Sequence, residues 1–262
     1  MLEAERLCAG YGGAERVHDV TLSLPKGKLT AIVGPNGSGK STLLKALAGL
    51  IRPMSGRVTL GGRDAAKISP RERAKLLSFL PQFRPAPEMT VSQLVAHGRY
   101  PHMGVRRALT QADKTIVEEA MARAGADAFA GTLVTQLSGG ERQRAYMAML
   151  LAQDAPVALL DEPAASLDPC AQFECMALLR QLAREGRAVA LVSHDLPLAM
   201  QLCDELLVME GGRLRAAFSP RAADAAAVLE EVFHIRLIPA GHGAYALGAC
   251  ATGYAMGMKG ES

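Results

Sequence analysis

The first segment of the sequence that could do chemistry is the glycine-rich stretch Gly34-Pro35-Asn36-Gly37-Ser38-Gly39-Lys40-Ser41-Thr42. It fits the pattern GxxxxGK[ST], in which successive backbone N–H groups point into one concavity and hold phosphate oxygens. Lys40 would reach the β- and γ-phosphates of a nucleotide, and the Ser41 hydroxyl would bind Mg²⁺. A turn that is glycine-rich by chance is the alternative. An apolar run before the stretch and helical spacing after it favour nucleotide binding.

Two adjacent carboxylates end a later apolar run, in Val157-Ala158-Leu159-Leu160-Asp161-Glu162-Pro163. A buried strand would deliver Asp161 to the end of a sheet, where an acid can hold Mg²⁺ directly or through water. Glu162 points in another direction and could polarise a water in line with the γ-phosphate. Without a nucleotide site nearby, the pair would be an ordinary turn at the end of a strand.

A second apolar run also ends in polar residues, in Leu191-Val192-Ser193-His194-Asp195. His194 could donate a hydrogen bond to the γ-phosphate and orient Glu162 with its water. A lone histidine is more often structural, but its place after a second parallel strand favours a catalytic role. The other five histidines lack metal-ligand spacing and are given no site role: His18, His97, His102, His234 and His242.

A second glycine-assisted helix start is found in Leu137-Ser138-Gly139-Gly140-Glu141-Arg142-Gln143-Arg144. Ser138 is a candidate N-cap, and Glu141 three residues later completes a capping box. By itself this is an ordinary helix start. In a chain that already holds one phosphate at a helix N-terminus, it is also a second end suited to anions.

The elements that position these residues alternate between strand and helix. Apolar patterns predict strands over Val17–Leu24, with inward Val20, Leu22 and Leu24, and over Leu29–Val33, Val157–Leu160 and Ala188–Val192. Helical spacing predicts helices over Ser41–Leu50, Val91–Ala96, Gln111–Ala124, Glu141–Ala152 and Gln172–Arg184. This order predicts an α/β core with a mostly parallel sheet, interrupted by a helical lobe.

The sequence as a whole resembles the ATP-binding subunits of ABC transporters, whose signature is LSGGERQR. The family's other elements follow in its order: Tyr11, the phosphate loop, Gln82, the signature, Asp161-Glu162, Ser166-Leu167-Asp168 and His194. The resemblance covers about residues 2–214. It implies a P-loop NTPase core, an N-terminal antiparallel β portion and an inserted helical subdomain.

The resemblance also assigns roles. Tyr11 would stack on adenine, and Gln82 would sense Mg²⁺ and the attacking water. Asp168 would cross an interface between two head-to-tail copies, in which the phosphate loop of one faces Ser138-Gly139-Gly140 of the other.

The expected catalytic residues are Glu162, His194, Gln82 and Lys40. The expected Mg²⁺ residues are Ser41, Gln82 and Asp161. The expected ATP contacts are Tyr11, Gly34–Thr42, Gln82, Asp161, Ser138, Gly139, Gly140, Glu141 and Asp168.

The same resemblance implies one ATPase domain over residues 1–262. The α/β core would take about 1–84 and 156–220, the helical subdomain about 85–155, and a C-terminal extension about 221–262. The stretch Leu237 to Met258 lacks Lys, Arg, Asp and Glu, but its Gly, Ala and His242 favour irregular strands and turns over a membrane span.

Composition excludes several classes of protein. The formal net charge is +3, which supports neither a nucleic-acid coat nor an acidic tail. The segment Arg99 to Arg107 is the nearest to a basic patch, and a solvated face is favoured there over a binding surface. The five cysteines show no CxxC spacing, so free buried thiols in a reducing compartment are expected. Acidic Glu3 and Glu5 argue against a signal peptide.

A subgroup is indicated by Gly98-Arg99-Tyr100-Pro101-His102, which resembles ATPases of iron–siderophore, haem and cobalamin importers. An ordinary loop broken by Gly98 and Pro101 is the alternative. The segment Val232-Phe233-His234-Ile235, with Tyr245, is weakly similar to the same subgroup. These resemblances therefore imply an ATP- and Mg²⁺-dependent homodimer at the cytoplasmic face of the inner membrane. It would work with a many-helix permease and, indirectly, a substrate-binding protein. A non-transport repair or regulatory ATPase, or an ABC subunit for another substrate, is the rival.

Overall fold

The computed structural model describes residues 1–104, 108–165, 167–241 and 244–248. The helices are α1 (Lys40–Leu47), α2 (Pro70–Leu76), α3 (Val91–His97), α4 (Gln111–Arg123), α5 (Gly139–Gln153), α6 (Pro169–Arg184), α7 (Leu196–Leu202) and α8 (Ala225–Phe233). The strands are β1 (Leu2–Tyr11), β2 (Ala14–Leu24), β3 (Leu29–Val33), β4 (Ser55–Leu60), β5 (Arg63–Asp64), β6 (Leu77–Leu80), β7 (Val157–Asp161), β8 (Ala188–Val192), β9 (Glu205–Glu210), β10 (Arg213–Phe218), β11 (Arg236–Gly241) and β12 (Ala244–Gly248).

The main sheet has six strands in the order β10-β9-β3-β8-β7-β6. All of its pairs are parallel except β9 with β10. Every residue of β3, β7 and β8 is buried, as expected for parallel strands covered by helices on both faces. Because parallel strands end at the same edge, the loops after β3, β7 and β8 are brought together there.

A second sheet has four strands in the order β2-β1-β4-β5, and its pairs are antiparallel. Val17, Val20, Leu22 and Leu24 of β2 are all buried, so the predicted inward set is confirmed. Their side chains join α1 and one face of the main sheet in a continuous apolar cluster. This cluster fixes the β1–β2 hairpin beside the loop that precedes α1.

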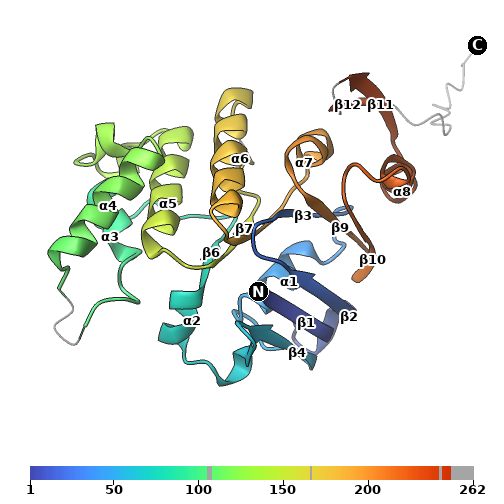
Figure 1. Cartoon of the computed structure of the whole chain (residues 1–262), viewed down its shortest axis with the longest axis horizontal. Coiled ribbons are helices and arrows are strands. Elements are labelled where there is room, and N and C mark those ends of the chain that lie inside the picture. Colours follow the sequence, from blue (N-terminus) through green and yellow to red (C-terminus); the bar gives the residue numbers. More distant parts are fainter. Residues whose placement is uncertain (105–107, 166, 242–243, 249–262) are drawn as a thin grey trace, which may run out of the picture.

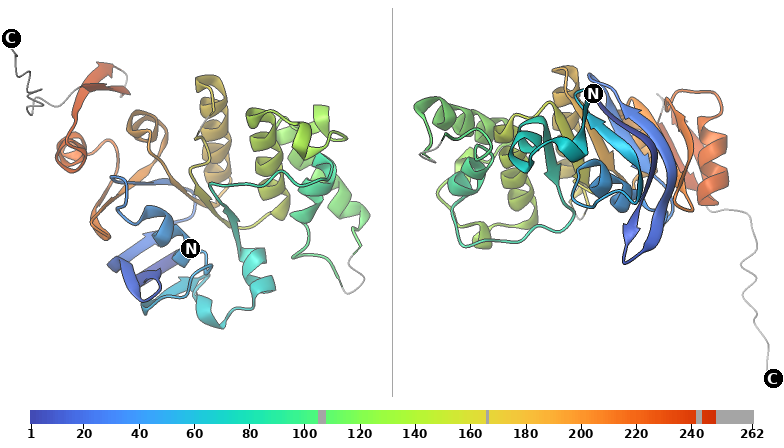
Figure 2. Two further views of the ribbon diagram at one scale, coloured as in Figure 1. Left: turned by 180° about the vertical axis from the view of Figure 1, so that it is seen from behind. Right: turned by 90° about the horizontal axis from the view of Figure 1, so that it is seen from below.

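The helices α3, α4 and α5 lie together at one end of the molecule, next to α6, and the hairpin β11–β12 lies at the other end (Figure 1). Both views of Figure 2 place these three helices apart from the antiparallel sheet. Apolar residues of α3, α4, α5, α6 and the main sheet form one cluster. The α/β class predicted from the sequence is therefore confirmed. Each predicted helix and strand is present, and its ends are either as predicted or shifted by a few residues.

Two expectations from the sequence need correction. Arg99 lies neither on a solvated face nor on a binding surface, because it is 7% exposed and paired with Asp113. The rest of that patch, 105–107, lies outside the described residues. Of the four described free cysteines, Cys175 and Cys203 are buried, whereas Cys8 is partly exposed and Cys170 is exposed. Within 237–258, the described part forms β11 and β12.

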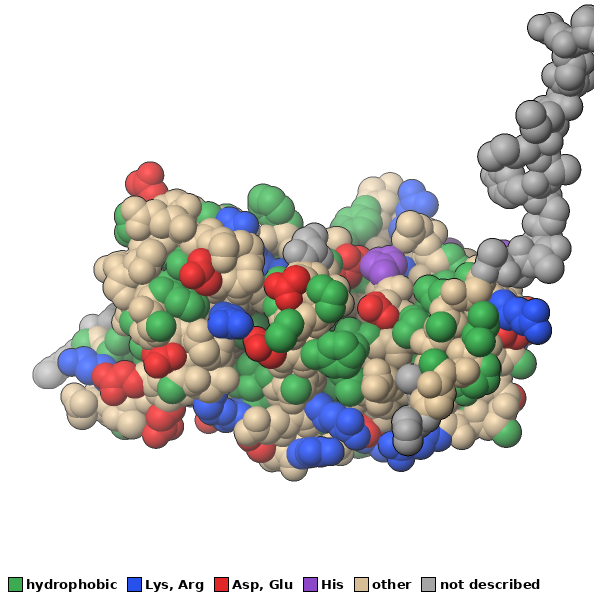
Figure 3. All heavy atoms as spheres, turned by 90° about the horizontal axis from the view of Figure 1, so that it is seen from above, with side chains coloured by type: hydrophobic (Ala, Val, Ile, Leu, Met, Phe, Trp, Pro, Cys, Tyr) green, Lys and Arg blue, Asp and Glu red, His purple; other side chains and the backbone are tan. Residues whose placement is uncertain are grey.

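On the face of the molecule drawn in Figure 3, side chains of both charges are interspersed, without a large area of one sign. Among the described residues, we find no helix with the length and apolar character needed to cross a membrane.

Candidate active site

The glycine-rich loop connects the buried strand β3 to α1 and leaves no room for side chains at two positions. A Cβ atom on Gly34 would lie 2.2 Å from the Met209 carbonyl oxygen. Gly39 has a φ of +92°, and a Cβ there would lie 2.6 Å from the Arg16 carbonyl oxygen. Glycine is therefore required where the loop passes over β9 and the β1–β2 hairpin.

The N-terminus of α1 has no side-chain cap, since its N-cap residue is Gly39. Its first N–H groups are therefore left for a ligand, and the helix dipole favours an anion there. Lys40 is 5% exposed, and its Nζ atom donates to the carbonyl oxygens of Gly34 at 2.8 Å and Pro35 at 2.9 Å. Burial lowers the pKa of Lys40, and the carboxylates of Glu162 and Asp161 oppose that shift.

The loop also contains a buried hydroxyl with no partner. Ser38 is 4% exposed, and its Oγ atom makes no hydrogen bond to any described residue. Its sequence neighbours Gly37 and Gly39 line a cavity of about 440 Å³, and the other lining residues are Tyr11, Arg16, Asn36, Lys40, Ser41, Thr42, Glu162 and His194. An unpaired hydroxyl, free N–H groups and a buried ammonium together fit the phosphates of a nucleotide.

Ser41 at the start of α1 and Asp161 at the end of β7 meet directly. The Ser41 hydroxyl donates to Asp161 Oδ1 at 2.9 Å. Asp161 is 2% exposed, and burial raises its pKa, opposed by the Ser41 hydrogen bond and by Lys45. A hydroxyl and a carboxylate beside a phosphate site are oxygen ligands of the kind that Mg²⁺ prefers, so the residues fit this ion.

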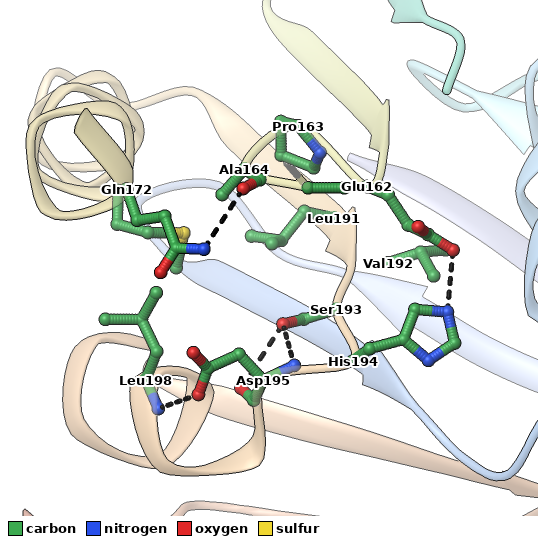
Figure 4. A pocket seen from close by; sticks show the side chains of 12 residues that line it. Glu162, Pro163, Ala164, Gln172, Leu191, Val192, Ser193, His194, Asp195 and Leu198 are labelled. Carbon is green, nitrogen blue, oxygen red and sulfur yellow. Dashed lines mark hydrogen bonds and ion pairs between the residues drawn. The ribbon is translucent and has the colours of Figure 1, made fainter. Parts of the chain in front are cut away.

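Glu162 is held between two polar side chains. Its Oε2 atom accepts from Gln82 Nε2 at 2.7 Å, and its Oε1 atom lies 2.6 Å from His194 Nε2. Figure 4 shows the carboxylate and the imidazole pointing toward each other from the loops after β7 and β8. Glu162 also has a φ of +50°, in the left-handed region that non-glycine residues rarely adopt. This backbone turn aims its side chain away from Asp161 and toward His194.

The signature residues do not line this cavity. Ser138 caps α5 in a complete capping box: its Oγ accepts from the Glu141 amide at 3.3 Å, and its own amide donates to Glu141 Oε2 at 2.9 Å. The Glu141 pKa is lowered, chiefly by the hydrogen bond from the Ser138 side chain. A Cβ atom on Gly139 or Gly140 would meet nothing within 4 Å. This helix end is therefore open to its surroundings.

Asp168, predicted to reach a second copy, is exposed and caps α6 by accepting from the Ala171 amide at 3.0 Å. Its neighbour Ser166 lies outside the described residues. Tyr11, predicted to stack on adenine, is 50% exposed and lies at the rim of the cavity.

The structure therefore brings the phosphate loop, Gln82, Asp161, Glu162 and His194 together, and it leaves the signature and Asp168 outside their cavity. Arg16 is a lining residue that the sequence reading missed. No motif marks it, and its only sequence signal is its place in the same hairpin as Tyr11.

The sequence was also compared with known proteins. Residues 17–165 match the ABC transporter family. The hemin import ATP-binding protein HmuV of Pseudomonas putida is 41% identical, and the alignment covers 92% of this chain and 96% of that protein. The iron(3+)-hydroxamate import protein FhuC of Bacillus subtilis is 38% identical, with coverages of 89% and 88%.

The cobalamin import ATP-binding protein BtuD of Halobacterium salinarum is 43% identical over 90% of this chain, which spans 59% of that protein's length. Among solved structures, a dimeric bacterial ABC transporter cassette has a TM-score of 0.75 at 27% identity, covering 85% of this chain and 100% of the other. The family match extends over more than half of the sequence, and the alignments with HmuV and FhuC, at 41% and 38% identity, cover 96% and 88% of those proteins. The chain belongs to the ABC transporter family, among its ATP-binding proteins.

Proposed function

We propose that this chain hydrolyses ATP and, as one of two paired copies, powers import of a metal chelate through a separate membrane permease. The observation that carries the ATPase part is the position of Glu162 between Gln82 and His194, at the rim of a cavity walled by the phosphate loop. A carboxylate in that place can accept a proton from a water that attacks the γ-phosphate.

The residues around Glu162 would each have a different role in binding or hydrolysing ATP. Free N–H groups of the loop and of α1 would bind phosphate oxygens, and Lys40 would leave its two carbonyl partners for the β- and γ-phosphates. Ser41 and Asp161 would hold Mg²⁺, which supplies positive charge against the phosphate oxygens when it is bound. Gln82 and His194 would keep the Glu162 carboxylate oriented toward the water. Tyr11 would stack on the adenine ring.

The pairing of two copies is supported by the second helix end. In this chain a Cβ atom on Gly139 or Gly140 would meet no described residue within 4 Å, and Ser138, Gly139 and Gly140 do not line the cavity at the phosphate loop. A second copy placed head to tail would bring them to its phosphate loop, and the similar cassette at 27% identity is a dimer. Asp168 would then lie at the interface.

The transport part rests on the relatives, whose names describe import of hemin, cobalamin and iron(3+)-hydroxamate. We assign this chain an iron–siderophore, haem or cobalamin-type substrate, delivered to the permease by a binding protein. The site of action would be the cytoplasmic face of the inner membrane. The division into an α/β core, a helical subdomain (about 85–155) and a C-terminal extension belongs to the same proposal.

Substitution of Glu162, the proposed general base, tests the ATPase part of the proposal. Glu162→Gln should lower the turnover of ATP by about 10²–10⁴-fold and leave nucleotide binding intact, because it removes the proton acceptor but keeps the side-chain shape. ATP should then accumulate in a stable dimer, which gel filtration with light scattering would detect. Glu118→Gln, on the exposed face of α4, is the matched control. Normal turnover by Glu162→Gln would exclude this residue as the base.

Isolation of the chain from its own membranes tests the transport part. With a cleavable tag and mild detergent, it should be recovered with a many-helix membrane protein, and ATP hydrolysis in the complex should respond to a loaded binding protein. Recovery with DNA or ribosomes instead would contradict the import function and favour a repair or regulatory ATPase.

A further inference from the structure

The segment Gly98–Met103, which follows α3, packs on the C-terminal end of α5, and we call it the anchor loop. A Cβ atom on Gly98 would lie 2.4 Å from the Met149 carbonyl oxygen and 2.9 Å from the Gln153 amide nitrogen. Any side chain there would push the loop off α5. The glycine of this motif is therefore needed for a close approach between two elements, beyond its effect of ending α3.

Arg99 makes the deepest contact of the anchor loop. Its Nη1 atom donates to the Ala152 carbonyl oxygen at 2.9 Å, and its Nε atom donates to Asp113 Oδ1 at 2.9 Å. Thr110 also donates to Asp113, and these bonds hold the Asp113 pKa at about 2. The guanidinium thus joins the last turn of α5 to the first turn of α4, where a positive charge complements the helix dipole of α5.

Further contacts tie the same helix end to the anchor loop, to α2 and to the main sheet. His102 Nε2 lies 2.8 Å from the Gln153 carbonyl oxygen, a distance at which a protonated ring nitrogen donates to it. The Gln153 side chain donates to the carbonyl oxygens of Ala74 at 2.7 Å and Leu77 at 3.1 Å, at the junction of α2 and β6. In return, Arg71 of α2 donates to the carbonyl oxygens of Pro101 and Met103 in the anchor loop.

The opposite end of α5 carries the signature Ser138-Gly139-Gly140. The helix has 15 residues, so its two ends are separated by roughly 20 Å. A tilt of about 5° at the anchored end would move the signature by roughly 2 Å. A displacement of about 1 Å in a catalytic group can lower a rate by about 10²-fold. Packing of α5 against α3 and α4 restrains this tilt, so we expect a loss of rate smaller than that value.

We infer that Arg99, His102 and Gln153 are positioning residues for the signature. They fix the far end of α5 against α2, α4 and β6 and so set where Ser138–Gly140 meets a second copy. This inference rests on the proposed function, because it needs the head-to-tail pairing of two ATPase copies. It gives the Gly98–His102 motif a mechanical role within the chain.

Variants at the partly exposed positions test the inference with little risk to folding. Gln153→Leu removes both donors to α2 and β6, and His102→Leu removes the donor to α5. His102→Gln keeps an N–H donor at that place and serves as the rescue. Tyr100→Ala is the control, since Tyr100 lies in the same loop, is 54% exposed and stacks on His97.

Each variant is made in the Glu162→Gln chain, and two quantities are measured: affinity of the monomer for a fluorescent ATP analogue, and the ATP concentration that half-saturates dimer formation. We expect Gln153→Leu and His102→Leu to leave the monomer's affinity within twofold and to raise the half-saturating ATP concentration about fivefold to tenfold. His102→Gln should restore most of the loss. In the otherwise native chain, the same two variants should lower kcat and leave the KM nearly unchanged.

Three outcomes count against these ideas in different ways. Equal dimer formation by Gln153→Leu, His102→Leu and Tyr100→Ala would overturn the positioning role. A loss of thermal stability without any loss of ATP-driven pairing would show a purely structural role and would also overturn it. If the Glu162→Gln parent itself does not pair with ATP, the proposed function fails, and the positioning role falls with it.

Discussion

The N-termini of α1 and α5 have similar sequences and different surroundings. Both begin next to serine and glycine residues, and both are suited to hold an anion. At α1, no side chain caps the helix, Ser38 Oγ is unpaired, and Lys40 is buried. At α5, Ser138 and Glu141 accept from each other's backbone N–H groups, and a Cβ atom on either glycine would meet no described residue within 4 Å.

This difference indicates what each end is prepared for. The α1 end is surrounded by Asp161, Glu162 and His194 of the same chain, so its unsatisfied groups await a small ligand. The α5 end is stable by itself and has no catalytic groups around it, so it awaits another surface. A helix N-terminus acquires its function from what the fold brings to it.

Among substitutions at the two helix ends, we expect the largest effect from the buried cation, Lys40. Lys40→Met should weaken ATP binding to the monomer by about 10- to 100-fold, because a charge-assisted hydrogen bond to phosphate is lost. Isothermal titration with a non-hydrolysable ATP analogue measures this. Lys28→Met, at an exposed position before β3, should bind normally. Equal affinities for the two variants would remove Lys40 from the site.

A pair of glycine substitutions sharpens the contrast between the two ends. Gly39→Ala should disturb the loop, because φ is +92° and the new methyl would meet the Arg16 carbonyl oxygen at 2.6 Å, and nucleotide affinity should fall about tenfold. Gly140→Ala meets nothing in the monomer, so affinity should stay unchanged and stability could rise by up to about 1 kcal/mol. ATP turnover by Gly140→Ala should still fall about tenfold, because the methyl would lie in the path of the second copy. Unaltered turnover would contradict that interface.

The unpaired hydroxyl at α1 gives a smaller and more specific effect. Ser38→Ala removes a buried polar atom that has no partner, so the free energy of unfolding without nucleotide should stay the same or rise by up to about 1 kcal/mol. With ATP present, the stabilisation by ligand should shrink, and affinity should fall about fivefold. Urea unfolding without nucleotide measures the stability of the free protein, and unfolding with nucleotide measures the stabilisation by ligand. A variant destabilised without ligand would show that Ser38 has a structural partner.

The capping box at α5 should give the smallest effect, and it depends on pH. The folded pKa of Glu141 lies below its ordinary value of 4.5, so its contribution to stability is present above that value and is lost as pH falls through the folded pKa. Glu141→Ala should therefore lower the melting temperature slightly at pH 7, and the difference should shrink as the pH falls below 4.5. Glu141→Gln, which can keep the capping box, should lose less. A difference that did not change with pH would contradict the role of the charge.

Much of the site was predictable because its parts are local. The phosphate loop, the strand-end acids Asp161 and Glu162, and the capping box at Ser138 each need only a few consecutive residues, whose order dictates their conformation. The strands β3 and β8 were predicted with their observed bounds for the same reason: a fully buried parallel strand is a short apolar run.

Other features could not be predicted, because they depend on partners distant in the sequence. Arg99 looked like part of an exposed basic patch. It is buried because Asp113 and the Ala152 carbonyl oxygen, from two other helices, satisfy its guanidinium. Arg16 reached the cavity wall through hairpin packing, which leaves no local pattern. Neither contact produces a periodic pattern in the sequence from which it could be predicted.

The sequence by itself determined that this chain holds a nucleotide-binding loop, an acidic strand end and a signature helix, since each is encoded by neighbouring residues. The tertiary structure alone decided how they are distributed. Parallel strands end at one edge, so β3, β7 and β8 gather Lys40, Asp161, Glu162 and His194 there. The signature belongs to α5, whose far end is fixed by the anchor loop, and it therefore lies outside the cavity that its own chain forms.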